Sequence, residues 1–157
     1  MSKLIREKHH RLPPIAYKGH TAVVFTANIQ GRKRLFNEKG IFEVFQKMLL
    51  KELESHNCSS YVYVFMPDHL HIIIAGESDG ASVKKCMDMF KQRTGFWLYK
   101  HKPDIRWQKD YYDHKIRNER DMTAQIRYIL QNPVHAGLES SWKKYPYKGS
   151  TKYNLDE

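Results

Sequence analysis

Cysteines and long apolar runs are both scarce in this sequence. The 157-residue chain has two cysteines, Cys58 and Cys86, which lie far apart and outside any Cys-x-x-Cys pair. Their spacing excludes a disulfide framework and a zinc knuckle, so we expect both to be packing residues. No apolar stretch is long enough to cross a membrane, and residues 1–11 are too charged for a secretory signal. We therefore expect a cytoplasmic protein without a membrane partner.

Acidic residues are also outnumbered. Lys and Arg total 27 against 17 Asp and Glu, which gives a formal net charge of +10. A basic chain with 10 tyrosines and 3 tryptophans favours a nucleic-acid partner, although a solvated basic surface would have the same composition. The hydrophobic content of 41% is sufficient for a core. We expect one domain over residues 1–157, with a basic arm at 1–14 and a tail at 149–157 that can move freely.

The central stretch of the chain, residues 61–76, contains two runs of strand-forming residues joined by a short turn. Because side chains alternate along a strand, His69 and His71 should project from one face, and Leu70 and Ile72 from the other. Neutral imidazole is the commonest protein ligand for metal ions, so this pair is a candidate metal site. The alternative is that both are ordinary half-buried sheet histidines.

The remaining elements alternate between strands and helices. We expect a strand over residues 17–29, a helix from an N-cap at Asn37 to about 56, the hairpin, a helix over 83–100, an extended segment over 105–117, and a helix from Asn118 to Asn132, ended by Pro133. This order predicts an α+β fold of the ferredoxin-like split βαβ type. Its antiparallel sheet should carry helices on one face, with an added C-terminal helix that bears Tyr128.

The predicted last helix has one apolar side, formed at helical spacing by Met122, Ile126, Ile129 and Leu130. Tyr128 points nearly opposite this side, and Asn132 lies one turn further on the same side as Tyr128. These polar residues could belong to a solvated face or to a phosphoryl-transfer site. A phenol, with a pKa of about 10, is a poor nucleophile at neutral pH and needs an electrophile polarised by a cation. A metal held by the two histidines would supply it.

Two segments together resemble a known family. Residues 66–71, MPDHLH, and residues 128–138, YILQNPVHAGL, are similar to the HUH-type single-tyrosine transposases, most closely the REP-associated tyrosine transposases. Residues 107–117 are also similar, and the resemblance extends over about 17–147. It implies that His69 and His71 bind a catalytic metal ion and that Tyr128 is the nucleophile.

The resemblance also implies an amide as the third metal ligand. We favour Asn132, which lies a full turn from Tyr128, over Gln131, although related insertion-sequence enzymes often use Gln. Asp68 stands where many family members have Asn, and its charge can either orient a histidine or have no role. His114 could be a further ligand or a general acid, or have a structural role.

The activity implied by the resemblance is cleavage and rejoining of single-stranded DNA at hairpins, through a 5′-phosphotyrosine intermediate and with Mg²⁺ or Mn²⁺. The hairpins would be REP-like sequences or the inverted repeats of element ends, and the protein, a monomer or a homodimer, would be associated with the nucleoid. Two other functions remain open: noncatalytic hairpin binding, and a metal-dependent nuclease that uses water.

Basic and aromatic side chains are the candidates for DNA contacts. Phosphate contacts are expected from Arg32, Lys33, Arg34, Lys91, Arg93 and Arg117. Stacking on unpaired bases is expected from Trp107 and from Tyr112 or its neighbour Tyr111.

Overall fold

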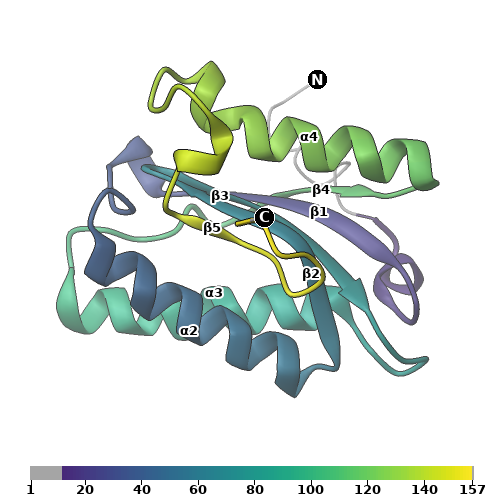
Figure 1. The fold of residues 1–157 in the computed structure, drawn as a ribbon. Helices are drawn as coiled ribbons and strands as arrows, with labels where there is room; N and C mark the ends of the chain where they lie inside the picture. The colour runs from purple at the N-terminus through teal and green to yellow at the C-terminus, as the bar shows by residue number, and fades with distance from the viewer. Residues whose placement is uncertain (1–11, 157) are drawn as a thin grey trace, which may run out of the picture.

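A computed structural model describes residues 12–156 and shows an α+β fold built on one antiparallel sheet (Figure 1). Its strands are β1 (Ala22–Asn28), β2 (Cys58–Met66), β3 (His69–Gly76), β4 (Tyr112–Lys115) and β5 (Lys148–Gly149), in the spatial order β4-β1-β3-β2-β5. The elements follow the predicted β-α-β-β-α-β order and then add a helix and a short edge strand, which confirms the predicted fold class. Most of the expected basic arm lies outside the described residues.

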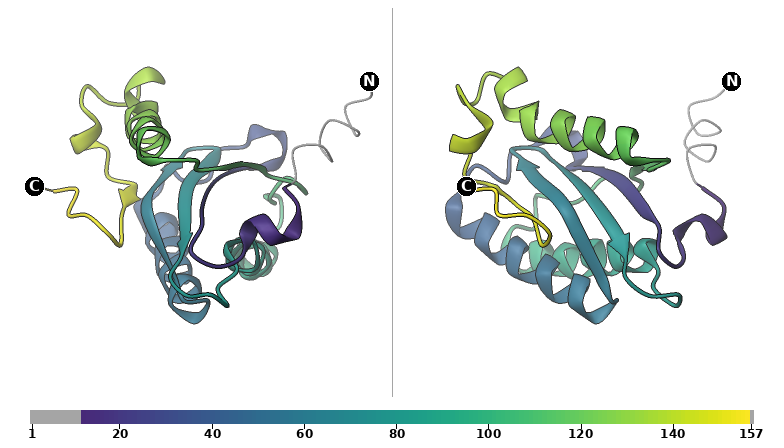
Figure 2. Two further views of the ribbon diagram at one scale, coloured as in Figure 1. Left: turned by 90° about the vertical axis from the view of Figure 1, so that its right-hand side faces the viewer. Right: turned by 45° about the vertical axis from the view of Figure 1, so that its right-hand side comes forward.

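The helices form two layers. Helices α2 (Lys39–Ser55) and α3 (Val83–His101) cover one face of the sheet, and α4 (Glu119–His135) lies across the opposite face (Figures 1 and 2). The alternation along β1 explains both layers: Val23 and Phe25 belong to the core under α2 and α3, while Val24 belongs to the smaller cluster under α4. Among the described helices, none combines the length and apolar character of a bilayer-spanning segment.

Strand β3 lies in the middle of the sheet and is paired on both sides. His71 is opposite Thr26 of β1 and Val64 of β2, and His69 is opposite Asn28 and Met66. A strand with both ladders occupied cannot slip by one residue without turning its apolar side chains out of the core. The position of the two histidines is therefore fixed by the register of the whole sheet.

The ends of two helices differ from the prediction. Helix α2 begins after Glu38 rather than Asn37, with no side-chain cap, whereas Asn118 caps α4 as expected by accepting a hydrogen bond from the backbone N–H of Asp121 at 2.9 Å. Helix α4 continues through Pro133 to His135. Proline lacks an N–H and so removes one helical hydrogen bond, but it does not end this helix.

The actual stop signal is Gly137. Its φ of +74° is left-handed, a conformation that glycine adopts without steric cost. The N–H of Leu138 donates to the carbonyl of Pro133 at 2.9 Å, and the N–H of Gly137 to that of Val134 at 3.0 Å. These two bonds form a Schellman motif, which closes the end of α4.

Two segments differ from the prediction: residues 105–117 are less regular, and the tail from residue 149 makes contacts with the rest of the fold. Of the extended stretch at 105–117, only β4 is a strand, and it is paired with β1. In the tail, β5 pairs with β2, Thr151 donates its backbone N–H to Ser60 at 2.9 Å, and Lys152 forms an ion pair with Glu77 at 2.8 Å. The first four residues of the expected tail therefore contact the sheet and the residue that follows β3.

Replacing Gly137 with alanine tests how α4 ends. We expect Gly137→Ala to lower the free energy of unfolding by about 1 kcal/mol, because a Cβ disfavours the left-handed conformation. The matched control is Gly40→Ala in the first turn of α2, where an added Cβ would meet no atom within 4 Å. That variant should be neutral or stabilising by up to about 1 kcal/mol. Chemical denaturation measures both, and equal effects would contradict the assignment.

Candidate functional site

The two histidines of β3 converge on one point. The Nε2 atoms of His69 and His71 are 3.1 Å apart, and their rings are almost perpendicular, at 89°. Nitrogen ligands bind divalent ions at about 2.1 Å, so two of them at right angles around one ion are about 3 Å apart. The pair therefore has the separation that adjacent ligands of a single metal ion require.

The other nitrogen of each ring is held by a hydrogen bond. His71 Nδ1 lies 3.0 Å from Thr26 Oγ1, and His69 Nδ1 lies 2.6 Å from a carboxylate oxygen of Asp68. The second oxygen of Asp68 accepts a hydrogen bond from Arg32 Nε at 2.9 Å. Hydrogen bonds of this kind orient the imidazoles of metal sites. Thr26 was not identified from the sequence, because the pairing of β1 with β3 is a long-range contact.

Both histidines are neutral around pH 7. Burial, together with the smaller effects of the nearby His69 and Arg32, lowers the pKa of His71 to about 3. Burial also lowers the pKa of His69, despite the opposing effect of Asp68. Burial acts to raise the pKa of Asp68, but its hydrogen bonds with His69 and Arg32 outweigh this and the pKa falls. The site thus offers neutral imidazoles beside an ionised carboxylate.

Tyr128 reaches the pair from α4. Its ring centroid is 6.0 Å from that of His71, with the ring planes at 75°, and 56% of its surface is exposed. The apolar side of α4 faces the sheet, as the helical spacing predicted, with Ile129 and Leu130 buried against Ile73. A cleft of about 170 Å³ is shared by residues of β1, β3, β4 and α4: Val24, Thr26, His71, Tyr112, Asp113, His114, Gln125, Tyr128 and Ile129.

The third-ligand candidates lie one turn further along α4. This helix runs in the same direction as β1, since Met122 lies beside Ala22 and Tyr128 beside Thr26. The next turn, with Gln131 and Asn132, continues toward the end of β1 that pairs with His69. Within residues 12–156 no group of three or more His, Cys, Asp and Glu side chains could hold a metal ion. The third ligand, for which the family resemblance implies an amide, stays our prediction at Asn132.

Some predicted DNA contacts lie near this site. Arg32, Lys33 and Arg34 are exposed in the turn that follows β1, where Lys33 Nζ donates to the carbonyl of Asp104 at 3.0 Å. Tyr112 is 43% exposed and lines the cleft, and Arg117 is exposed directly before α4.

Three other predicted contacts lie elsewhere. Trp107 is only 8% exposed and donates from Nε1 to Thr94 Oγ1 at 2.8 Å, so it is a core residue and cannot stack on bases. Lys91 donates to the carbonyl of Gln108 at 2.9 Å, and Arg93 pairs with Glu52 at 2.5 Å. Both belong to α3, which covers the sheet face away from Tyr128.

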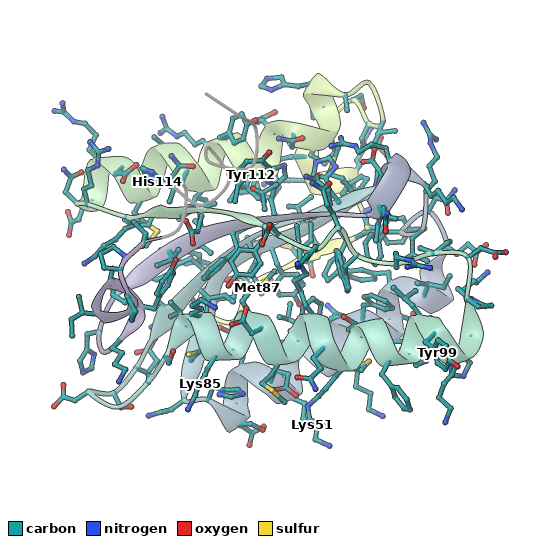
Figure 3. All side chains as sticks on the ribbon, turned by 180° about the vertical axis from the view of Figure 1, so that it is seen from behind. Lys51, Lys85, Met87, Tyr99, Tyr112 and His114 are labelled. Carbon is teal, nitrogen blue, oxygen red and sulfur yellow. The ribbon has the colours of Figure 1, made fainter. Side chains whose placement is uncertain are left out.

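His114 connects β4 to α4. Its Nε2 lies 3.0 Å from a carboxylate oxygen of Asp121, which also accepts the backbone N–H of Arg117 at 2.9 Å. Figure 3 shows His114 and Tyr112 on the α4 side of the sheet, and Lys51 and Lys85 on the far side. This contact joins β4 to the first turn of α4, which favours the structural role among those considered for His114. Tyr111, the rival of Tyr112, is 5% exposed and bonds Asp88, so it is not available for stacking.

Comparisons with known proteins agree with this geometry. The family model described as IS200-like transposase matches residues 16–132. A REP-associated tyrosine transposase of Escherichia coli K12 is 25% identical over 127 residues, covering 78% of this chain and 72% of that protein. A Haemophilus influenzae protein, assigned provisionally to the same group, is 24% identical over 139 residues, covering 78% and 76%. The solved structure of a REP-associated tyrosine transposase bound to a REP hairpin has a TM-score of 0.76 at 21% identity, covering 94% and 90%.

The neutrality of His71 predicts a pH dependence of stability. Its pKa falls from an ordinary 6.5 to about 3 in the fold, so between these values the unfolded chain binds a proton that the folded protein does not. Stability from this residue is complete above pH 6.5 and is lost as the pH falls, by at most about 1.4 kcal/mol per unit. His71→Gln should therefore show a shallower fall in unfolding free energy between pH 6 and about 4. Equal slopes in denaturation series would contradict the burial of a neutral His71.

Proposed function

The chain belongs to the family of IS200-like transposases, and on this basis we propose that it cleaves and rejoins single-stranded DNA at REP-like hairpins through Tyr128. Its relatives are named as tyrosine transposases, so it is an enzyme of DNA transposition. The observation that carries the proposal is the meeting of one exposed tyrosine with two converged histidines at the same cleft.

A hairpin substrate is supported by a relative and by charge. The structural relative is described as bound to a REP hairpin. This chain has a net charge of +10, and it exposes Arg34 in the turn that follows β1 and Arg117 directly before α4. Cationic side chains of this kind contact phosphates without reading the sequence, so recognition of a particular hairpin needs additional base contacts.

His69, His71 and Asn132 would hold the divalent ion, Mg²⁺ or Mn²⁺. When bound, the ion would polarise the scissile phosphate and offset the charge that develops on it. Two neutral imidazoles and an amide add no negative charge to oppose this effect. The lowered pKa values of both histidines keep the rings neutral at neutral pH, so that each ring has one nitrogen without a hydrogen.

Tyr128 would act as the nucleophile. Its oxygen forms a bond to phosphorus, the bond from phosphorus to the 3′ oxygen breaks, and the phenol proton is lost as the 3′ oxygen gains one. The product is a 5′-phosphotyrosine and a free 3′-hydroxyl. Attack by another 3′-hydroxyl reverses these changes and rejoins the DNA. The exposure of Tyr128 supports this role, because a DNA backbone can reach a phenol that is 56% exposed.

Removing the hydroxyl of Tyr128 tests the nucleophile. We expect Tyr128→Phe to lose all covalent attachment to a labelled hairpin, while the free energy of unfolding changes by less than about 1 kcal/mol. Tyr112→Phe is the matched control, since Tyr112 is also exposed at the cleft. Denaturation followed by mass spectrometry maps the adduct. Cleavage that persists in Tyr128→Phe would favour the water-dependent nuclease.

Removing either histidine tests the metal site. His69→Ala and His71→Ala should abolish cleavage, yet leave hairpin affinity within about tenfold, because phosphate contacts dominate binding. Excess chelator should have the same effect on the wild type. Cleavage that continues in chelator would show that the histidines act without a metal. If the wild type binds hairpins tightly but never cleaves them, it is a noncatalytic hairpin-binding protein.

A further inference from the structure

Asp68 and Arg32 lie behind the histidine pair and are joined to it by hydrogen bonds. One carboxylate oxygen of Asp68 lies 2.6 Å from His69 Nδ1, and the other accepts from Arg32 Nε at 2.9 Å. A second nitrogen of Arg32 donates to the side-chain oxygen of Asn28 at 3.1 Å. Asn28 is the β1 residue paired with His69. The hydrogen bonds therefore lead from His69 through Asp68 and Arg32 to Asn28, which is the strand partner of His69.

We propose that Asp68, held by Arg32, is a positioning residue that fixes His69 with its hydrogen on Nδ1 and with Nε2 free to bind a cation. A carboxylate has no hydrogen to donate, so it selects the tautomer in which Nδ1 carries one. The bare Nε2 then faces Nε2 of His71 at 3.1 Å. This inference rests on the proposed role of His69 as a metal ligand.

The use of both carboxylate oxygens explains why an acid is needed here. The two contacts use different oxygens of Asp68, so an asparagine in the same position would place its oxygen against one donor and its NH2 group against the other. Its amide hydrogens would then face a donor. Only the carboxylate of Asp68 in this network can accept hydrogen bonds from a histidine and a guanidinium at once. Both partners of the first bond are largely buried, since the side chain of Asp68 is 23% exposed and that of His69 is 13% exposed.

The backbone around Arg32 supports a positioning role for this arginine. Gly31 and Arg32 both have left-handed φ values, +70° and +55°. This conformation is uncommon for a residue with a side chain and is usually kept where neighbouring contacts require it. Here it directs the guanidinium to Asp68 and Asn28, while Arg34, two residues later, is exposed. The two arginines of one turn thus have different roles: Arg32, although partly exposed, is bonded to Asp68 and Asn28, and Arg34 is available for phosphate.

Nitrogen NMR of the histidine rings in metal-free protein tests the proposal directly. In the wild type, His69 should carry its hydrogen on Nδ1. In Asp68→Ala, His69 should be a mixture of two tautomers, with the hydrogen on Nδ1 in some molecules and on Nε2 in others. In Asp68→Asn, the proportion of the Nδ1 tautomer should lie between those of the wild type and Asp68→Ala. The proposal is overturned if wild-type His69 carries its hydrogen on Nε2, or if Asp68→Ala leaves the ring signals unchanged. This measurement requires no metal and no DNA, so its outcome does not depend on whether the proposed reaction occurs.

Calorimetry with Mn²⁺ gives a second readout. Loss of a residue that orients a metal ligand typically weakens binding by about 10–100-fold, and we expect this for Asp68→Ala. Arg32→Ala should also weaken Mn²⁺ binding, although removal of a nearby positive charge by itself would strengthen it. The matched control, Arg34→Ala, removes the same charge from the same turn and should not weaken it.

The direction in which Arg32→Ala changes Mn²⁺ affinity decides whether Arg32 acts by positioning or by its charge. Tighter Mn²⁺ binding in both arginine variants would mean that Arg32 acts through its charge alone, which overturns its positioning role. In the double variant, loss of Arg32 should add little to the loss of Asp68, because the two act through one contact. If the wild type does not bind Mn²⁺, the metal part of the proposed function fails, and the ring signals still decide whether Asp68 positions His69.

Discussion

The site depends on the convergence of two imidazole nitrogens from one strand. His69 and His71 meet at 3.1 Å because β3 is paired on both sides, so that alternation places them on one face at a fixed register. The apolar residues between and after them, such as Leu70 and Ile72, are fully buried on the other face. A slip of one residue would exchange the two sets, so the core that stabilises the sheet also specifies the site.

The second half of the site depends on the layer arrangement. Helices α2 and α3 occupy one face of the sheet, which leaves the histidine face for α4 (Figure 1). The helix is held there by its apolar side, by the pair of His114 with Asp121, and by the Gly137 stop. Tyr128 then projects beside His71 and remains accessible. The packed helix and the central strand hold the proposed nucleophile and the proposed cation ligands rigidly, as phosphoryl transfer requires.

The sequence predicted the parts of this arrangement that follow from local periodicity. Strand alternation identified the faces of His69 and His71, and helical spacing identified the side on which Tyr128 lies. The sequence does not indicate which face of the sheet each helix covers. Arg93 was therefore predicted to contact DNA, although α3 lies on the sheet face away from Tyr128. Trp107 was expected to stack on bases because aromatic residues near charges suit that role equally well. Its burial depends on a long-range contact with α3, which no local pattern encodes.

We propose that this site transfers a DNA strand through a covalent bond to Tyr128. Each in-line displacement at phosphorus inverts its configuration, so two successive displacements restore it. A hairpin substrate with a single phosphorothioate of known chirality at the scissile position measures this outcome. A covalent bond to Tyr128 predicts retention of configuration in the rejoined strand. Inversion in the rejoined strand would mean a single direct attack by the incoming strand and would contradict a covalent intermediate on Tyr128.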